Sequence, residues 1–403
     1  MIGRLRPQLI GLARQLVAVA TVNPPGSEYE RFIDILTRQC RLRRLTTQRH
    51  VVPAGDARAL GVTQGSRRIS LISRWPVKAA KTFHINAHYD VVPAHAADWR
   101  TAPFRPVVRQ GKLFGRGTED MKANIACTLI AVQALRQLSI TPAVNVELSF
   151  TPDEETGSAA GVRYLMQHGL LRATYALGEG YEGDYVSLGN KGMLWLEVEA
   201  AGKAAHGSTP YQGVNALTML LPVLASLHRL RERVEKRRTN YPVKDPRDSR
   251  ASMVIGGSIR TGDNVNIVPD RAMVTIDRRV LPEETLARAR AEIEAAVAEC
   301  RNRQRRYFVR VLSSEEPVVS PPDAHYFGVF DQALRQVRGR PMKTALMTGG
   351  TDMRFFMRRG IPALGYSVEG QQRAHAANEF VFVRSLVETA QVIALVISGL
   401  GRE

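Results

Sequence analysis

Two adjacent glutamates, Glu154 and Glu155, follow an apolar run in the segment TPDEETGS, residues 151–158. Carboxylates repel each other, so an isolated pair of this kind most often lies in a solvated turn. A chemical role requires partners elsewhere in the chain. In open α/β sheets ligands bind beyond the carboxyl ends of the strands, so polar residues that follow predicted strands are the first place to look.

His88 and Asp90 stand at the end of another strand-like segment, HINAHYDVVP. A single histidine at a strand end is usually structural. Asp90 lies two residues further on, however, and on an extended strand it shares the same side, where it can accept the second N–H of the imidazole. This carboxylate–histidine pair is the arrangement that fixes the orientation of a metal-binding imidazole.

Three further candidates lie in glycine-rich turns or loops: Asp120 in GRGTEDMKAN, Glu179 in ALGEGYEG and His375 in QRAHAANEFV. Asp120 could equally be the cap of the helix that follows. Taken together, the candidates supply histidines and carboxylates without cysteine. Such mixed nitrogen and oxygen ligands suit zinc, cobalt or manganese, and one carboxylate can bridge two ions.

The elements that must position these residues alternate between strands and helices. Apolar patterns predict strands at 67–75, 81–90 and 143–150, and helices at 123–138 and 158–171. This alternation predicts an α/β fold with a mostly parallel sheet.

The pattern changes after residue 190. Strand-like segments and two predicted helices, at 213–236 and 283–301, follow a β-α-β-β-α order typical of a small two-layer α+β domain of ferredoxin-like type. We therefore expect such a domain at 189–304, inserted into a larger domain formed by 1–188 and 305–403.

Composition restricts the classes of function. The 403 residues carry a formal charge of +18 and three cysteines without a CxxC pair. The cysteines argue against a disulfide framework or thiolate metal site and favour a reducing, cytoplasmic location. No apolar run is long enough to span a bilayer, so no membrane partner is expected. The positive charge raises nucleic-acid binding as an alternative. The basic residues are spread along the chain, however, and no recognised nucleic-acid motif is present, so the charge is expected to favour anionic small substrates instead.

Motifs along nearly the whole chain occur in the order seen in one known group of enzymes: HINAHYDVVP, GRGTEDMK, TPDEETGS, GKAAHGSTP, NIVPDRAMVTIDRR, MTGGTDMRFF and RAHAANEF. The sequence resembles the co-catalytic zinc hydrolases that include acetylornithine deacetylase, succinyl-diaminopimelate desuccinylase, aminoacylase and glutamate carboxypeptidase. The resemblance implies two divalent metal ions, zinc with cobalt or manganese as alternatives. It also implies a homodimer formed through the inserted domain, which acts as a lid as well.

The resemblance assigns a role to each candidate. One metal is held by His88, which Asp90 orients, and by Glu179; the other is held by Glu155 and His375, and the bridge between them is Asp120. Glu179 is followed by Gly180, where several relatives have proline, so nearby Glu182 and Asp184 remain alternatives to it.

Glu154 becomes the general base in this interpretation. Adjacent residues on a turning backbone point in different directions, so Glu155 can bind metal while Glu154 faces the attacking water. Two cations remove the repulsion between the carboxylates and lower the pKa of a shared water from about 15.7 towards 7. Glu154 then passes the proton to the leaving amine.

The resemblance also assigns residues that contact the substrate. His206 corresponds to the histidine that reaches a neighbouring subunit's site and stabilises the oxyanion, although an exposed loop histidine is the simpler interpretation from the sequence alone. Further substrate contacts are expected from Asn266, from Arg279 rather than adjacent Arg278, and from the loop residues Gly349, Gly350 and Thr351. That loop could also be a purely structural turn.

These features predict an enzyme that cleaves the amide of a carboxylate-bearing N-acyl amino acid or a small peptide. Deacylation of the acetylornithine or succinyl-diaminopimelate kind fits the motifs best. A carboxypeptidase or dipeptidase on the same scaffold is the alternative activity. A catalytically silent binding protein is the alternative of another class, and the retention of every expected ligand and of Glu154 argues against it.

Overall fold

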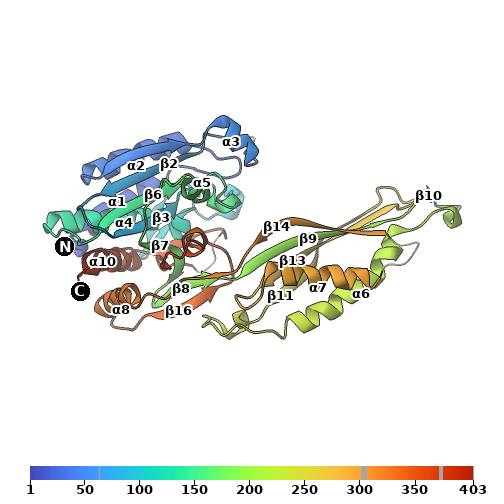
Figure 1. Cartoon of the computed structure of the whole chain (residues 1–403). Helices are drawn as coiled ribbons and strands as arrows, with labels where there is room; N and C mark the ends of the chain where they lie inside the picture. Colours follow the sequence, from blue (N-terminus) through green and yellow to red (C-terminus); the bar gives the residue numbers. More distant parts are fainter. Residues whose placement is uncertain (63, 301–305, 372–374, 403) are drawn as a thin grey trace. The chain divides into compact units, whose positions relative to one another are not determined.

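The computed structural model describes residues 1–62, 64–300, 306–371 and 375–402. The chain forms two compact units. The main unit comprises Met1–Gly189, Ser320–Thr344 and Thr351–Glu403, and the insert comprises Asn190–Val319 and Ala345–Gly350. Figure 1 shows both units. No helix in the described part of the chain is long and apolar enough to cross a membrane.

The main unit is built on a sheet with strand order β1-β2-β6-β3-β7-β17-β8. Its central strands β6, β3, β7 and β17 are parallel, whereas the pairs β1–β2, β2–β6 and β17–β8 are antiparallel. The strands are β1 (Thr46–Val51), β2 (Ile69–Trp75), β3 (Thr82–His88), β6 (Asn145–Thr151), β7 (Tyr175–Glu182), β8 (Tyr185–Asn190) and β17 (Ala363–Ser367). This architecture confirms the predicted α/β fold with a mostly parallel sheet.

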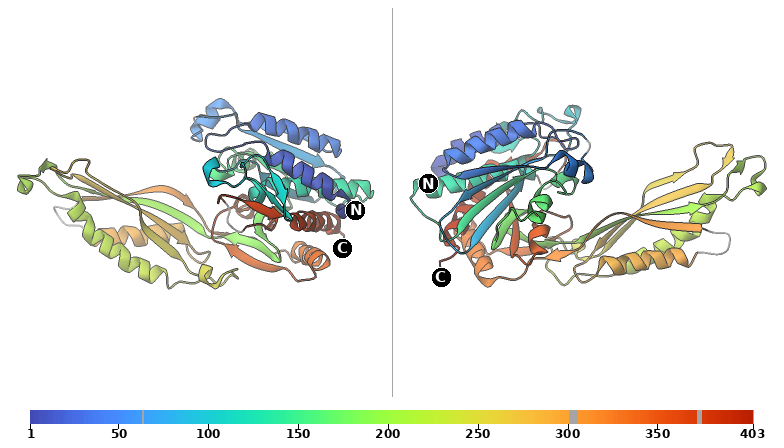
Figure 2. Two further views of the ribbon diagram at one scale, coloured as in Figure 1. Left: turned by 180° about the vertical axis from the view of Figure 1, so that it is seen from behind. Right: turned by 45° about the horizontal axis from the view of Figure 1, so that its top comes forward.

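Helices cover both faces of this sheet (Figure 2). Strands β3 and β6 are accordingly buried almost continuously instead of in alternation. Helix α4 is buried nearly all round and packs against α1 and α10. The helices are α1 (Arg6–Val17), α2 (Tyr29–Leu42), α3 (Ala54–Ala59), α4 (Ala123–Gln137), α5 (Val162–Gln167), α8 (Ala324–Arg338), α9 (Met353–Met357) and α10 (Val383–Gly399). A small antiparallel sheet adds β4 (Val107–Arg109), β5 (Lys112–Phe114) and β18 (Phe380–Phe382).

The insert is an antiparallel sheet with strand order β11-β13-β9-β14 and two helices. Strand β13 alternates strictly between buried and more exposed residues, because only one face of the sheet is covered by α6 and α7. Helix α6 begins at the side chain of Asn215, which accepts hydrogen bonds from two amides of its first turn. The elements are β9 (Gly192–Ala201), β10 (Ala205–His206), α6 (Ala216–Val234), β11 (Ser252–Thr261), β12 (Ile267–Val268), β13 (Arg271–Val280), α7 (Leu286–Ala298) and β14 (Arg306–Glu315). Two short strands near the unit boundaries are β15 (Val318–Val319) and β16 (Lys343–Met347).

The observed boundaries differ from those expected from the sequence. The insert begins at Asn190, one residue after the expected start, and its first segment ends at Val319 instead of residue 304. The reason is β14, which the sequence pattern suggested was a return to the larger domain. In the structure β14 pairs along its whole length with β9 and completes the sheet of the insert.

Candidate metal centre

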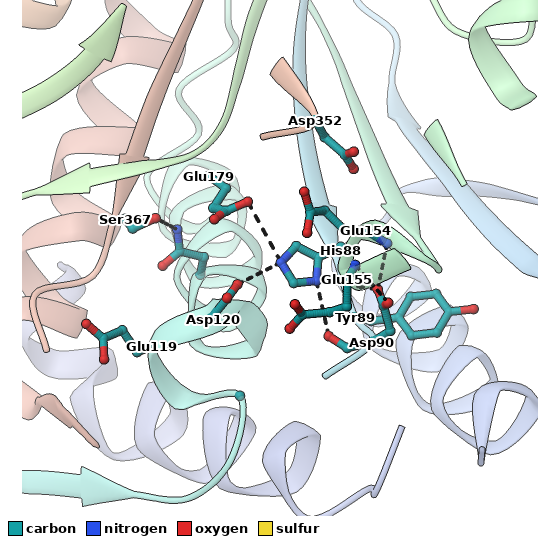
Figure 3. Close-up of polar contacts among 12 residues, drawn as sticks. His88, Tyr89, Asp90, Glu119, Asp120, Glu154, Glu155, Glu179, Asp352 and Ser367 are labelled. Carbon is teal, nitrogen blue, oxygen red and sulfur yellow. Dashed lines mark hydrogen bonds and ion pairs between the residues drawn. The ribbon is translucent and has the colours of Figure 1, made fainter. Parts of the chain in front are cut away.

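The candidate ligands of the main unit meet at the carboxyl ends of the parallel strands. His88 is the last residue of β3 and pairs in register with Thr151, the last residue of β6. The turn that carries Glu154 and Glu155 follows β6 directly. Glu179 lies in the second half of β7, which is parallel to β3. Parallel strands that end together therefore gather residues that are distant in sequence (Figure 3).

The first group of ligand atoms comes from His88, Asp120 and Glu179, and these atoms lie within 4.8 Å of one another. His88 Nε2 is 2.8 Å from Asp120 Oδ1 and 4.0 Å from Glu179 Oε2. Figure 3 shows both carboxylates directed at the same ring nitrogen. An acceptor pair around one imidazole nitrogen is the arrangement that a metal ion would complete.

The second group consists of Asp120, Glu155 and His375, also with ligand atoms within 4.8 Å of one another. His375 Nε2 lies 2.9 Å from Glu155 Oε2 and 3.3 Å from Asp120 Oδ2. Asp120 thus directs one oxygen to each group. A carboxylate shared in this way has the geometry of a bridge between two ions.

Asp90 ties the first group to the turn with the two glutamates. Its backbone oxygen lies 3.1 Å and its Oδ1 3.4 Å from His88 Nδ1. The same side chain accepts the amides of Glu154 and Glu155, each at 3.2 Å, and an N–H of Asn23 at 2.9 Å. Asp90 therefore fixes the orientation of the imidazole and of the turn at once.

The electrostatics of this cluster suit bound cations. Burial raises the pKa of Glu179 well above its usual value, and Asp120 and Glu154 raise it further. Burial also raises the pKa of Glu155. Oxygens Oε1 of Glu155 and Oε2 of Glu179 are buried and have no hydrogen-bond partner in the described part of the chain. Buried carboxylate oxygens without donors are costly unless a cation or proton satisfies them, so the residues fit a pair of metal ions.

The same carboxylates favour the protonated form of both histidines. Burial alone would lower the pKa of His88, but Asp120 and Asp90 raise it well above the usual value. Hydrogen bonds to Asp120 and Glu155 raise the pKa of His375 to about 10. Asp120 is buried, but its pKa is lowered because the two imidazoles outweigh the effect of burial. The cluster thus attracts positive charge.

Glu154 and Glu155 leave their turn in different directions, as the sequence predicts for adjacent residues on a turning backbone (Figure 3). Figure 3 also shows the side chain of Glu154 approaching Asp352. Burial raises the pKa of Glu154 to about 8, against the lowering effect of His88 and Arg354, while Asp352 adds to the rise. Arg354 Nη1 lies 3.7 Å from Glu154 Oε1.

Two residues near Glu154 were not found from the sequence. Asp352 and Arg354 are buried and both hydrogen-bond to Ser158, which follows the same turn. They lie in the motif MTGGTDMRFF, in which the sequence alone suggests a role only for the two glycines and the first threonine after them. The signal was a pair of opposite charges in an apolar segment, which is unusual unless the charges are paired.

The geometry favours Glu179 over its two alternatives. Among the described residues, Glu179 lies in a candidate metal-binding group with His88 and Asp120, and neither Glu182 nor Asp184 does. Asp184 instead lies 3.4 Å from Arg338 and 3.3 Å from Arg340. Gly180, in the position where relatives have proline, packs so closely against Gly365 that a Cβ atom there would lie 2.2 Å from its backbone.

The candidates His206, Asn266 and Arg279 belong to the insert. His206 in β10 pairs with Ile267 in β12, and the amide of Gly207 donates to the carbonyl of Asn266 at 2.6 Å. His206 and Asn266 are therefore close neighbours, and both are exposed. The hydroxyl of Ser208 lies 2.7 Å from Nδ1 of His206.

Arg278 and Arg279 differ in how accessible their side chains are. Arg278 faces the core of the insert, with a side chain 1% exposed, and its Nη2 lies 2.7 Å from Glu284. Arg279 lies on the uncovered face of the sheet, 30% exposed, with its Nε 2.9 Å from Asp277. Only Arg279 is free to exchange its partner for a ligand.

The loop predicted to contact a substrate carboxylate divides between the units. Gly349 and Gly350 belong to the insert, and Thr351 begins the next segment of the main unit. A Cβ atom at Gly349 would meet no atom within 4 Å, so this glycine lies against open space. Thr351 is buried, and its carbonyl accepts the amide of Arg354.

Comparison with known families gives one match over most of the chain. Residues 84–399 match the model of peptidase family M20/M25/M40. This range contains all of the ligands above and Glu154.

Individual relatives are distant but cover most of the chain. An uncharacterized metallohydrolase of Methanocaldococcus jannaschii is 26% identical over 81% of this chain and 83% of its own length. Mouse aminoacylase-1 is 24% identical over 89% of this chain and 86% of its own. The succinyl-diaminopimelate desuccinylase of Nitratiruptor sp. is 26% identical over 72% and 77%.

Solved structures share the fold at lower identity. Aminopeptidase PepT of Bacillus cereus superposes with a TM-score of 0.76 at 20% identity, covering 98% of this chain and 99% of that one. An M20 family metallo-carboxypeptidase of Sulfolobus solfataricus gives a TM-score of 0.76 at 18% identity, covering 97% and 98%.

Proposed function

Since this chain belongs to peptidase family M20/M25/M40 and is a metal-dependent hydrolase, we propose that it removes the acyl group from N-acyl amino acids that carry a free carboxylate. The observation that carries the proposal is the pair of ligand groups that share Asp120, next to a carboxylate that is not a ligand. Such a site matches amide hydrolysis by an activated water.

The five ligand residues would bind two divalent ions, which we propose to be zinc. His88 and Glu179 would hold the first ion, Glu155 and His375 the second, and Asp120 both. When bound, the two ions would polarise the scissile carbonyl and lower the pKa of a bound water towards neutral pH.

Glu154 is the proton carrier of the proposed reaction. It takes a proton from the attacking water as the new C–O bond forms. It then gives that proton to the nitrogen of the leaving amine as the C–N bond breaks, which leaves a carboxylic acid and an amino acid. Burial raises its pKa above that of an ordinary carboxyl group, towards the range in which a group can both accept and return a proton.

Residues of the insert supply substrate recognition in this proposal. The guanidinium of Arg279 would bind the substrate carboxylate, because its planar fork matches two carboxylate oxygens. Asn266 would hydrogen-bond to the substrate, and Gly349 and Gly350 of the insert, with Thr351 of the main unit, would lie near its carboxylate. His206 would stabilise the oxyanion in the site of a second copy of the chain, which requires a dimer formed through the insert.

A substrate panel tests the proposed activity. The zinc-loaded protein should hydrolyse N-acetyl or N-succinyl amino acids with a higher kcat/KM than dipeptides, and a chelator should abolish the reaction. Liberated amine is measured for N-acetyl, N-succinyl and N-carbamoyl amino acids and for dipeptides. Preference for dipeptides would replace deacylation by peptidase activity. A protein that binds zinc but cleaves none of the four classes would contradict both.

A further inference from the structure

Glu379 is a completely buried carboxylate that the proposed reaction does not use. It accepts hydrogen bonds from four donors. Its Oε1 accepts the amides of Glu119 at 2.7 Å and Asp120 at 3.3 Å, and its Oε2 accepts the amide of Gly117 at 3.1 Å. The fourth donor is Nη1 of Arg116, at 2.6 Å. The loop that carries the bridging ligand is therefore folded around one side chain.

Arg116 extends this contact to a second ligand. While Nη1 donates to Glu379, Nη2 donates to the backbone carbonyl of His375 at 2.9 Å. Arg116 is itself only 3% exposed and lies against the ring of Trp99, with the guanidinium carbon 5.3 Å from the ring centre. A buried guanidinium with both ends engaged is held in one orientation, so it can transmit the position of one loop to the other.

The backbone of His375 needs such support. Its φ of +70° lies in the left-handed region, which costs about 1–2 kcal/mol for a residue with a side chain. A residue keeps this conformation when surrounding contacts impose it. His375 is also half exposed, with 52% of its side chain accessible, so packing alone does not fix its ring. The hydrogen bond from Arg116 to the carbonyl of His375 supplies a contact that holds this backbone directly.

We propose that Glu379 and Arg116 form a positioning pair that builds the second ligand group by holding Asp120 and His375 at the distance a metal ion requires. This inference rests on the proposed function. Neither residue touches metal or substrate; they act through the backbone of the two loops. Asp90 acts in the same way on His88 and on the turn of Glu154 and Glu155, so two buried carboxylates organise the loops that carry the ligands.

The two ligand groups should depend on this pair to different extents. His375 belongs only to the second group, whereas Asp120 keeps a direct 2.8 Å contact to His88 in the first. Loss of the pair should therefore weaken the second metal ion far more than the first. Partners that orient ligands from outside the coordination shell typically change metal affinity about 10- to 100-fold.

The test is stepwise binding of Zn²⁺ to metal-stripped protein, measured by competition with a chromophoric chelator. Glu379→Gln keeps the shape of the side chain but replaces one carboxylate oxygen by an NH2 group, which cannot accept the hydrogen bonds that this oxygen accepts. Arg116→Lys keeps the positive charge but loses the second guanidinium nitrogen, which donates to the carbonyl of His375. Both variants should bind the first equivalent within a few-fold of the parent and the second about 10- to 100-fold more weakly. Excess Zn²⁺ should restore kcat, because every ligand is still present.

Glu147→Gln is the matched control. Glu147 is also buried in the main unit and also accepts several hydrogen bonds, from His84, Arg74 and the amide of Arg172, but it lies outside both ligand groups. It should lower the melting temperature without changing either zinc affinity. Equal weakening of both equivalents, or unchanged binding in both variants, would overturn the positioning role. A parent protein that binds no zinc would instead refute the proposed function itself.

Discussion

The main unit and the insert present their functional residues in opposite ways. In the main unit the candidate ligands are already in contact with one another: Asp120 reaches both histidines within 3.3 Å. In the insert His206 and Asn266 are exposed, and Arg279 is partly exposed. His206 and Asn266 lie at one edge, and Arg279 lies on the uncovered face, paired with Asp277. The first region is organised by the fold, whereas the candidates of the second contact different partners among the described residues of the insert.

This difference has a physical basis. Metal ligands must be held close together against their mutual repulsion, and this requires buried hydrogen bonds such as those of Asp90 and Glu379. Residues that grip a substrate gain from remaining accessible, because binding must exchange water or a weak ion pair for the ligand. Substitutions in the main unit should therefore affect chemistry and metal content, and those on the open side of the insert should affect substrate affinity.

The largest effect is expected at Glu154. Glu154→Gln keeps the size of the side chain and removes the proton acceptor, so kcat should fall by about 10²- to 10⁴-fold. KM and zinc content should stay near the parent values, because Glu154 is not among the ligand groups. Steady-state kinetics together with metal analysis checks this. Turnover near the parent rate would remove Glu154 from the mechanism.

A smaller effect is expected at Arg279, and its neighbour supplies the control. Arg279→Met should raise KM about 10- to 100-fold, the loss expected for a charge-assisted hydrogen bond, and leave the melting temperature unchanged. Arg278→Met should do the reverse: it removes a buried partner of Glu284 and should destabilise the protein by about 1–3 kcal/mol without changing KM.

Kinetics and thermal unfolding of the two variants give the answer. If Arg278→Met raised KM and Arg279→Met did not, the assignment of the two arginines to core and open face would have to be exchanged.

The smallest effect concerns pH. In the metal-free protein His375 keeps its proton up to about pH 10, because hydrogen bonds to Asp120 and Glu155 raise its pKa. Metal binding requires the neutral ring, so each ion that binds to the second group must displace this proton. The affinity of the second zinc equivalent should accordingly rise as pH increases from 6 to 8. Calorimetry in buffers of different ionisation enthalpy measures the released protons, and affinity independent of pH would contradict the expectation.

The sequence predicted those features that depend on local pattern. The strand that ends at His88, the turn with the two glutamates and the parallel order of the strands all follow from apolar periodicity and glycine-rich turns. The ligand roles came from the order of motifs along the chain. These roles stay predictions, although the structure brings the five residues together.

Features that depend on long-range pairing were missed. The sequence of β14 suggests that the α/β pattern of the larger domain resumes there, and only its pairing with β9 shows that it belongs to the insert. Glu379 and Arg116 are 263 positions apart, and no local pattern indicates that they meet. The motif RAHAANEF contains Glu379, but in the sequence only His375 had an evident chemical use.

The most direct measurement is the position and number of metal ions in crystals of the zinc-loaded protein, located by anomalous scattering at the zinc edge. We expect two peaks, one among His88, Asp120 and Glu179 and one among Asp120, Glu155 and His375, with the carboxylate of Asp120 between them. A single peak away from Asp120, or no peak in protein that is active, would contradict this expectation.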